Sequence, residues 1–272
     1  MKAIIIFMFL LISNIAIASD FGAYMGAPNE RVMTILSTDK SKKSAIIEPE
    51  NFTAEEIKAL KANNCQIYSY INVGAIENWR DYFEEYKNIT IKPYKNWSEE
   101  YWINAGEKQW QDFVVDTLAK NAFDKGTDGF FLDNFDLYYF FESDEIYDGL
   151  ALILAKLQKY GKKIIINGGD TFVDTIIRNG MSSLIYGVCQ ESVFTRITNY
   201  KQGKFSKQKS STTKYYIDYL EKAKKAGVKI FVIEYAKSPS IANDIAQKCS
   251  KSGYHYYISE SLELDGRETF LY

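Results

Sequence analysis

Histidine is almost absent from this sequence: His255 is the only one among 272 residues. A metal site built on two imidazoles is therefore excluded within this chain, and a Ser-His-Asp relay has little basis. The three cysteines, Cys65, Cys189 and Cys249, form no Cys-x-x-Cys pair. Neither a zinc ribbon nor a disulfide framework is indicated, and we expect the cysteines to be small buried side chains. These absences leave carboxylates as the main candidates for chemistry.

Long hydrophobic runs are also scarce, and the one that stands out lies at the start of the chain. Lys2 precedes an apolar run at residues 3–11, and the segment closes on Ala-Ile-Ala at residues 16–18. This pattern is typical of a secretory signal peptide. A membrane anchor is the alternative, but the run is too short to span a bilayer and Ser13 and Asn14 interrupt it. We predict that residues 1–18 are a signal peptide and that the mature protein is secreted or periplasmic, with no membrane partner.

No second apolar span and no long Pro or Gly linker divides residues 19–272. We therefore expect one domain with a large core, although the length also permits two small domains. Without Lys2 the formal net charge changes from −2 to −3, and no cluster of Lys and Arg with interleaved aromatic residues is present. Nucleic acid is not expected as a partner, and we expect a monomer.

Strand-like runs alternate with helical patterns from residue 20 onward, as in a parallel sheet built from βα units. The runs are residues 21–26, 44–48, 66–72, 129–133, 163–167, 184–189, 229–235 and 254–259. Eight such units in about 250 residues predict a single (β/α)₈ TIM barrel. An open doubly wound sheet is the alternative, but no Gly-x-Gly-x-x-Gly follows the first run. His255 falls in the last run, where a buried wall position and a cleft position are equally expected.

The helical patterns carry their own start and stop signals. Thr53 and Glu56 have the spacing of a capping box, while Gly161 and Gly227 stand where a left-handed helix end is expected. Apolar stripes at helical spacing predict the helix faces that pack on the sheet. The stripes are Ile57 and Leu60; Trp110, Phe113, Val114, Leu118 and Ala122; Ile146, Leu150, Ile153, Leu154 and Leu157; and Tyr216, Leu220 and Ala223.

The connection after the third strand is unusually long, covering residues 73–107. Its aromatic residues include Trp79, Tyr82, Phe83, Tyr86, Tyr94, Trp97, Tyr101 and Trp102. Long βα connections tend to be functional, so we predict an aromatic-rich loop that covers the barrel mouth and stacks on sugar rings. A small satellite core under the loop is the alternative, and the two interpretations can apply to different rings.

Polar side chains recur at the predicted carboxyl ends of the strands, which converge on one face of a barrel. They are Tyr24, Glu48, Tyr70, Asn72, Asp133, Asn134, Asp136, Asn167, Glu191, Glu234 and Tyr235. For any one of them the alternative is a solvated loop residue or a helix cap, and for Asp136 the cap is at least equally expected. Tyr24 and Tyr70 fit packed barrel tyrosines as well as substrate contacts.

Two of these acids form the expected catalytic pair, Asp133 and Glu191. Glycoside hydrolysis needs one acid to protonate the leaving oxygen and a second carboxylate to attack the anomeric carbon or activate water. Asp133 directly follows a buried apolar strand, which suits a nucleophile held with little freedom. Glu191 follows the next strand but one, beside Phe194, which suits a general acid of raised pKa. Glu234 is the competitor for either role.

Four segments resemble the endo-α-1,4-polygalactosaminidase family of glycoside hydrolases, family 114. They are residues 70–80 (YINVGAIENWR), 129–136 (GFFLDNFD), 190–192 (QES) and 232–235 (VIEY). The resemblance implies a secreted barrel that cleaves a galactosamine-containing polysaccharide internally. It also implies catalytic roles for Asp133 and Glu191 and a place for Glu77 among the substrate-binding residues. Glu48 stands where the resemblance implies an aspartate.

We predict a glycosidase that acts on an amino-sugar polysaccharide through Asp133 and Glu191, with retention of configuration and without a metal or other cofactor. A carboxyl separation near 5 Å would support retention, and roughly 6.5 to 9.5 Å would support inversion. The first rival is a non-catalytic carbohydrate-binding barrel. The second is a hydrolase with an acid-only metal site made of Asp133, Asp136 and Glu234.

Overall fold

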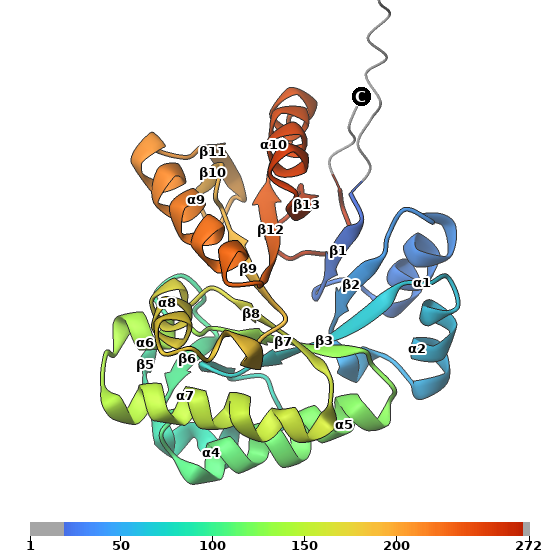
Figure 1. Cartoon of the computed structure of the whole chain (residues 1–272). Coiled ribbons are helices and arrows are strands. Elements are labelled where there is room, and N and C mark those ends of the chain that lie inside the picture. Colours follow the sequence, from blue (N-terminus) through green and yellow to red (C-terminus); the bar gives the residue numbers. More distant parts are fainter. Residues whose placement is uncertain (1–18, 269–272) are drawn as a thin grey trace, which may run out of the picture.

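Eight parallel strands form the centre of the protein in the computed structural model, which describes residues 19–268. In spatial order they are β1 (Phe21–Tyr24), β2 (Ser44–Ile47), β3 (Gln66–Asn72), β7 (Gly129–Asp133), β8 (Lys163–Asn167), β9 (Gly187–Glu191), β12 (Lys229–Tyr235) and β13 (His255–Ser259). Helices surround the strands (Figure 1). This arrangement confirms the predicted TIM-barrel fold.

Four strands, β3, β7, β8 and β12, agree with the prediction residue for residue. The prediction was wrong for β9, which begins at Gly187 because Ser182–Leu184 forms a 3₁₀ turn in place of strand. The shift makes Glu191 the last residue of its strand. Glu191 therefore occupies a position equivalent to that of Asp133 in β7.

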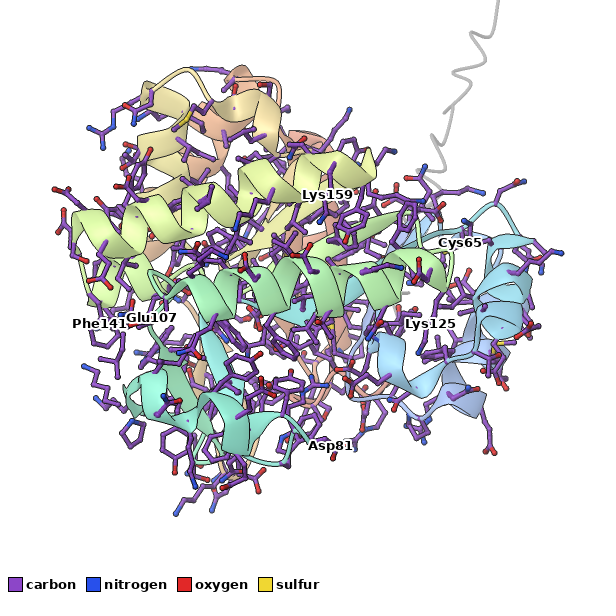
Figure 2. All side chains as sticks on the ribbon, turned by 90° about the horizontal axis from the view of Figure 1, so that it is seen from below. Cys65, Asp81, Glu107, Lys125, Phe141 and Lys159 are labelled. Atoms are coloured by element: carbon purple, nitrogen blue, oxygen red, sulfur yellow. The ribbon has the colours of Figure 1, made fainter. Side chains whose placement is uncertain are left out.

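The longer helices pack around the sheet. They are α1 (Asn29–Thr38), α2 (Ala54–Lys61), α4 (Lys108–Phe113), a π-helical segment (Val114–Leu118), α5 (Ala119–Asp124), α7 (Asp144–Leu157), α8 (Asp170–Arg178), α9 (Ser210–Lys225) and α10 (Pro239–Ser252). The predicted apolar stripes fall on α2, on α4 to α5, on α7 and on α9. Thr53 and Glu56 form both hydrogen bonds of the capping box at the start of α2. Figure 2 shows α7 running beside α4 and α5. An ion pair of 2.8 Å joins Lys156 of α7 to Asp112 of α4.

Alternation along the strands decides which side chains reach the barrel interior. Phe131, Ile165, Cys189 and Ile233 pack together in one buried cluster, whereas their neighbours Phe130, Leu132, Ile164, Ile166, Val188 and Val232 pack in another with the helices. Two positions beyond the interior residues stand Asp133, Asn167, Glu191 and Tyr235. These four side chains therefore share the inner face at the carboxyl ends of the strands.

The barrel is nearly closed, since no strand ladder joins β13 to β1 within residues 19–268. Side chains hold this seam together: the rings of Tyr24 and Tyr257 meet edge to face at 5.5 Å. The Tyr24 hydroxyl donates a hydrogen bond of 3.0 Å to Glu268. Tyr24 is fully buried and joins the seam and not the mouth, as the packed-tyrosine alternative predicted.

The long connection after β3 contains secondary structure that the sequence did not reveal. It folds as a three-stranded antiparallel sheet in the order β4 (Ala75–Glu77), β6 (Glu100–Ile103), β5 (Thr90–Pro93), with the one-turn helix α3 (Phe83–Tyr86). Most of its rings form a satellite core against α4. The contacts are Tyr82 with Phe113, Tyr86 with Trp110 and Phe113, Phe83 with Tyr101, and Tyr94 with Trp102.

A second insertion follows β9: the antiparallel hairpin of β10 (Thr195–Asn199) and β11 (Lys204–Lys207). No strand is predicted there from the sequence. The three cysteines are buried and unpaired, which confirms the expectation for them. None of the helices in residues 19–268 is both long and apolar enough to cross a membrane. The predicted signal peptide lies outside the described residues.

Candidate active site

Three neighbouring strands end in polar side chains at the mouth of the barrel: β7 in Asp133, β8 in Asn167 and β9 in Glu191. The next residue in each case has a left-handed backbone, with φ of 65° at Asn134, 67° at Gly168 and 58° at Ser192. This conformation is uncommon for side chains other than glycine and turns the chain sharply. The three strand ends are thus matched in position and in geometry.

Asn167 joins the two predicted catalytic acids. Its Nδ2 group donates hydrogen bonds of 2.9 Å to Asp133 Oδ1 and of 2.9 Å to Glu191 Oε1. The amide orientation is fixed by chemistry, because an ionised carboxylate only accepts hydrogen bonds. The two carboxylate oxygens are at most 5.8 Å apart, twice 2.9 Å. With N–H bonds that diverge by about 120°, the separation is close to 5 Å.

Two tyrosines fix the outer oxygens of the same acids. The Tyr70 hydroxyl donates to Asp133 Oδ2 at 3.0 Å, and the Tyr235 hydroxyl donates to Glu191 Oε2 at 2.5 Å. The Asn134 backbone N–H adds a third donor to Asp133 at 2.8 Å. Phe205 of the β10–β11 hairpin stacks on Tyr235 with ring centroids 5.5 Å apart. Tyr70, Asn167 and Tyr235 therefore position the acids.

The electrostatics of the pair are those of a partly desolvated site. Burial, reinforced by the charge of Glu191, raises the pKa of Asp133 to about 7. The hydrogen bonds from Asn167, Asn134 and Tyr70 act in the opposite direction because they stabilise the ionised form. Asp133 consequently keeps its proton to a higher pH than an exposed aspartate does. Glycoside hydrolysis requires a protonated carboxyl group, which donates a proton, beside an ionised carboxylate, which attacks the sugar.

Asp136 also lies near the pair but has a different contact. It occupies the first position before the short helix α6 (Leu137–Phe140), yet its side chain makes no capping hydrogen bond there. Its Oδ1 accepts a hydrogen bond of 3.0 Å from the Gly169 backbone, so it ties the β7 loop to the β8 loop. Burial raises the pKa of Asp136 to about 6. The predicted cap position is correct, but the side chain does not cap.

Behind Asp133 lies a second polar layer that includes one acid, Glu100, that was not predicted from the sequence. Asn134 Nδ2 donates to Asn72 Oδ1 at 2.9 Å and approaches Glu100 Oε2 at 3.5 Å. Asn72 Oδ1 also accepts from the Ala75 backbone at 3.0 Å. Burial, then the charges of Glu77 and Asp133, raise the pKa of Glu100 to about 8. Glu100 lies in β6, whose pairing with β4 brings it to the site and is not visible in the local sequence.

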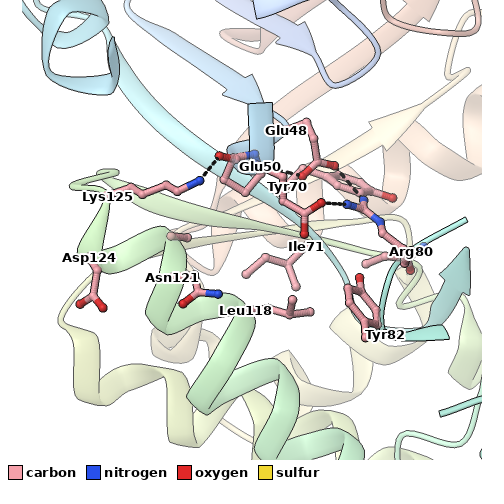
Figure 3. Close-up of a pocket in the computed structure, with 13 residues that line it drawn as sticks. Glu48, Glu50, Tyr70, Ile71, Arg80, Tyr82, Leu118, Asn121, Asp124 and Lys125 are labelled. Atoms are coloured by element: carbon pink, nitrogen blue, oxygen red, sulfur yellow. Dashed lines mark hydrogen bonds and ion pairs between the residues drawn. The ribbon is translucent and has the colours of Figure 1, made fainter. Parts of the chain in front are cut away.

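Glu48 and Glu77 form an ion cluster around Arg80, which is itself buried. Arg80 lies 2.7 Å from Glu48, 3.0 Å from Glu50 and 3.3 Å from Glu77. Figure 3 shows this guanidinium at the edge of a cavity of about 270 Å³. Tyr70 and Asn72 line the cavity, but Asp133 and Glu191 are not among its lining residues. Glu48 thus lies with Tyr70 and Asn72 at this cavity, while Glu77 contacts Arg80.

Glu234 does not join the site. It alternates with Ile233 and Tyr235 and so points to the helix side of the sheet, where it is fully buried. Its carboxylate accepts from the backbone of Phe194 at 2.7 Å and of Thr195 at 2.9 Å. It anchors the start of the β10–β11 hairpin. The proposed acid-only metal site is not assembled, and residues 19–268 hold no group of three or more His, Cys, Asp or Glu placed to share a metal ion.

His255 is also remote from the mouth, because it is the first residue of β13 and the strands end at the opposite side. Its Nδ1 lies 3.0 Å from Asp20, and its ring stacks on Phe231 at 4.9 Å. The wall alternative therefore holds for the single histidine.

Aromatic residues from the two insertions meet at the mouth. Trp97, in the turn between β5 and β6, contacts Tyr200, in the turn between β10 and β11, with ring centroids 6.0 Å apart. Burial and then the charge of Glu191 raise the pKa of Tyr200. Burial and then the charges of Asp136 and Asp133 also raise the pKa of Tyr94. The rings reach the site from both sides of β7 and β8.

Comparisons with known proteins agree with this geometry. Residues 27–271 match the model of glycoside-hydrolase family GH114. The glycoside hydrolase domain of PelA from Pseudomonas aeruginosa has a TM-score of 0.73 at 16% identity, over 90% of this chain and 94% of that one. Aspergillus fumigatus Ega3, solved in complex with galactosamine, has a TM-score of 0.71 at 14% identity, over 94% and 96%.

A more distant structural likeness is the maltogenic α-amylase AmyB from Thermotoga neapolitana, with a TM-score of 0.58 at 9% identity, over 94% of this chain and 72% of that one. A comparison with curated protein sequences found no match. At these identities the solved structures establish the fold alone. The family model covers nearly all of the chain, and the protein therefore belongs to glycoside hydrolase family GH114.

Proposed function

We propose that the protein hydrolyses internal glycosidic bonds of a galactosamine-containing polysaccharide with retention of configuration. The observation that carries the proposal is the bridge from Asn167, which holds Asp133 and Glu191 with oxygens at most 5.8 Å apart, twice 2.9 Å. Retaining enzymes need a separation of about 5 to 5.5 Å, because the nucleophile attacks the sugar directly. Inverting enzymes need more room for a water molecule. The galactosamine bound to Ega3 supports the choice of sugar.

In the first half of the proposed reaction, the Asp133 carboxylate attacks the anomeric carbon. The carboxyl group of Glu191 gives its proton to the leaving oxygen as the glycosidic bond breaks. In the second half, the Glu191 carboxylate takes a proton from water. The resulting hydroxide attacks the anomeric carbon and releases Asp133 as a carboxylate. Asp133, with three hydrogen-bond donors, is the more firmly oriented acid, as the nucleophile must be.

Reducing-end release from a panel of amino-sugar polymers tests the activity. The wild type should cleave a galactosamine-containing polymer, and Asp133→Asn should reduce the rate by about 10³-fold or more while remaining folded. A fall in viscosity ahead of reducing-end release would support internal cleavage. Substantial hydrolysis by the variant would refute the assignment of Asp133, and binding without cleavage by the wild type would favour a carbohydrate-binding barrel. The anomer formed first, observed by proton NMR, decides between retention and inversion.

The proposal includes export, which rests on the pattern of residues 1–18. Expression of the complete sequence in a secreting host, followed by N-terminal sequencing, tests this part. A mature chain that begins at Ser19 is expected. Retention of Lys2 and the apolar run in the extracellular or periplasmic protein would contradict it.

A further inference from the structure

Two exposed aromatic rings stand side by side on the short helix α6. The exposed fraction is 62% for Tyr139 and 52% for Phe140, and their ring centroids lie 5.1 Å apart. The opposite side of α6 is anchored, because Leu137 is fully buried and Tyr138 packs against Phe172 at 6.2 Å. Single exposed apolar residues are normal on a protein surface, whereas adjacent exposed rings form a candidate contact surface. We call Tyr139 and Phe140 the α6 shelf.

Packed side chains join the α6 shelf to the catalytic mouth. The ring of Phe140 meets that of Trp102 in β6 at 5.2 Å. Trp102 lies two residues beyond Glu100, and alternation along β6 places both side chains on one face of the strand. Glu100 approaches Asn134 at 3.5 Å, and the Asn134 backbone N–H donates to Asp133. The shelf is therefore continuous with the surroundings of the nucleophile.

The chain order also places the α6 shelf at the same end of the barrel as the catalytic pair. α6 starts directly after Asp136, in the loop that follows Asp133 at the end of β7. Asp136 accepts a hydrogen bond of 3.0 Å from the Gly169 backbone, just before α8. Figure 1 shows α6 next to α8 and β6. A long polymer that passes between Asp133 and Glu191 continues across this end of the barrel, so the shelf belongs to the surface that such a chain can cover.

We propose that Tyr139 and Phe140 form a distal binding site for a sugar ring of the polysaccharide, beyond the sugars that lie against the catalytic pair. This inference rests on the proposed function and concerns how the enzyme holds long chains. A pyranose ring presents a face of C–H groups, which packs favourably on an aromatic ring. Burial of this face also removes apolar surface of both partners from water.

The α6 shelf should act only on chains long enough to reach from the catalytic pair to α6. Affinity should therefore rise beyond a threshold chain length. The C–H face is common to galactosamine and N-acetylgalactosamine, so the rise should be equal for deacetylated and N-acetylated chains. Added salt should leave the rise unchanged, because the contact is apolar and salt screens charges.

The test is calorimetry with galactosamine oligosaccharides of increasing length. Glu191→Gln is the parent throughout, because it removes the proposed general acid. Phe140→Leu removes the aromatic face but keeps an apolar side chain against Trp102. This variant should bind long oligosaccharides about 2- to 10-fold more weakly than the parent, and the shortest ones within about twofold. Addition of Tyr139→Ala should deepen the loss for long chains.

Two further variants serve as controls. Phe140→Trp keeps an aromatic face at this position and should bind long oligosaccharides as well as the parent does. Phe123→Ala removes an exposed ring from α5 in the outer helix layer, and it should change binding at no chain length.

Equal weakening at every chain length in Phe140→Leu would show that the ring supports Asp133 through Trp102, and would overturn the inference. Unchanged binding at every length, or no binding to the parent, would also overturn it. A dimer that Phe140→Leu dissociates in sedimentation, without any dependence on chain length, would assign the shelf to a contact between copies instead. Failure of the proposed function is distinguishable, since Phe140-dependent binding of long chains by a wild type that cleaves no polymer would leave the distal site standing.

Discussion

Asn167 joins two acids at the ends of the strands on either side of its own. Its Nδ2 group serves both carboxylates, while its Oδ1 atom has no hydrogen-bond partner among the described residues. The two carboxylates therefore orient the Asn167 amide, and the amide in turn orients them. The sequence identified Asn167 as a strand-end residue, but its bridging role depends on the register of β7, β8 and β9. Without that register, its partners could not be named.

The raised pKa of Asp133 has a consequence for stability. The folded-state pKa of Asp133, about 7, exceeds its ordinary value of 3.8. The stabilisation of the folded state by protonated Asp133 is therefore fully present below pH 3.8 and is lost as pH rises through 7. The Asp133→Asn variant has no carboxyl group to ionise at this position, so it does not lose this stability as pH rises. We expect the variant to be more stable than the wild type by about 1 to 3 kcal/mol at pH 8, and equally stable at pH 4.

Urea denaturation at the two pH values measures this difference. Asp112 provides a control of opposite sign, because hydrogen bonds from Lys108 and then Lys156 lower its pKa to about 2. Asp112→Asn should be less stable than the wild type at pH 8. If Asp133→Asn is less stable at pH 8 than at pH 4, relative to the wild type, Asp133 is not a desolvated acid.

The same titration predicts the pH dependence of the reaction. Asp133 must be ionised to attack the anomeric carbon, and its pKa of about 7 means that the carboxylate forms only as pH approaches neutrality. We expect kcat/KM to rise as pH rises towards about 7. Glu191→Gln removes the neighbouring charge, so the pKa of Asp133 should fall, and carbon NMR of the labelled carboxyl should detect the change. An unchanged or higher pKa in that variant would contradict the coupling.

Among the elements, the barrel strands were predictable and the two insertions were not. β3, β7, β8 and β12 are apolar runs bounded by helices, so local composition determines them. The antiparallel strands β4, β5, β6, β10 and β11 are short, and their pairing depends on turns and on the surface beneath them. Glu100 and Tyr200 reach the site only through those pairings. The sequence thus revealed the acids on the barrel and missed the residues that the insertions contribute.

Contact between the two insertions should matter for long substrates. Trp97 and Tyr200 come from connections after β3 and β9, which flank the strands that carry Asp133 and Asn167. Their rings lie where a polysaccharide would cross the mouth, and such a contact contributes about 0.5 to 1.5 kcal/mol. Tyr200→Ala should lower kcat/KM about 3- to 10-fold on long polymer and leave short oligosaccharides within about twofold.

Initial rates on a ladder of chain lengths provide the measurement. Phe123 on α5 is a suitable control, because its exposed fraction of 38% equals that of Tyr200 and it lies on the outer helix layer. Phe123→Ala should change neither rate. A uniform loss at all chain lengths in Tyr200→Ala would indicate that the ring supports Glu191 and does not contact the polymer.

The whole molecule shows how far a repeated pattern constrains a fold. Eight apolar runs predict eight strands, and closure of the sheet then brings their carboxyl ends together without any long-range signal in the sequence. In residues 19–268, no strand ladder closes the sheet between β13 and β1. Residues near the carboxyl end of the described chain cover this seam, and Glu268 pairs there with Ser259 through an isolated bridge. The contact joins segments too far apart in sequence for any local pattern to predict.

The ion pair between Lys42 and Glu268 should stabilise this seam. The Lys42 ammonium is almost fully buried and lies 2.8 Å from Glu268, which also accepts the hydrogen bond from Tyr24. Loss of Glu268 leaves this buried ammonium with the more distant Asp39, at 3.9 Å, as its acidic partner among the described residues, which is costlier than the original pair is favourable. Glu268→Ala should reduce the free energy of unfolding by about 2 to 4 kcal/mol. A second change, Lys42→Met, should recover part of that loss because it removes the stranded charge.

Denaturant unfolding of the single and double variants separates these contributions, with Glu263→Ala as an exposed control in the same segment. Activity at 25 °C should be preserved in all of them, because β1 and β13 lie across the barrel from β7 and β8. The double variant should be more stable than Glu268→Ala alone. If the two losses simply add, Lys42 and Glu268 stabilise the fold independently. The seam would then depend on the packing of Tyr24 against Tyr257 and not on the ion pair.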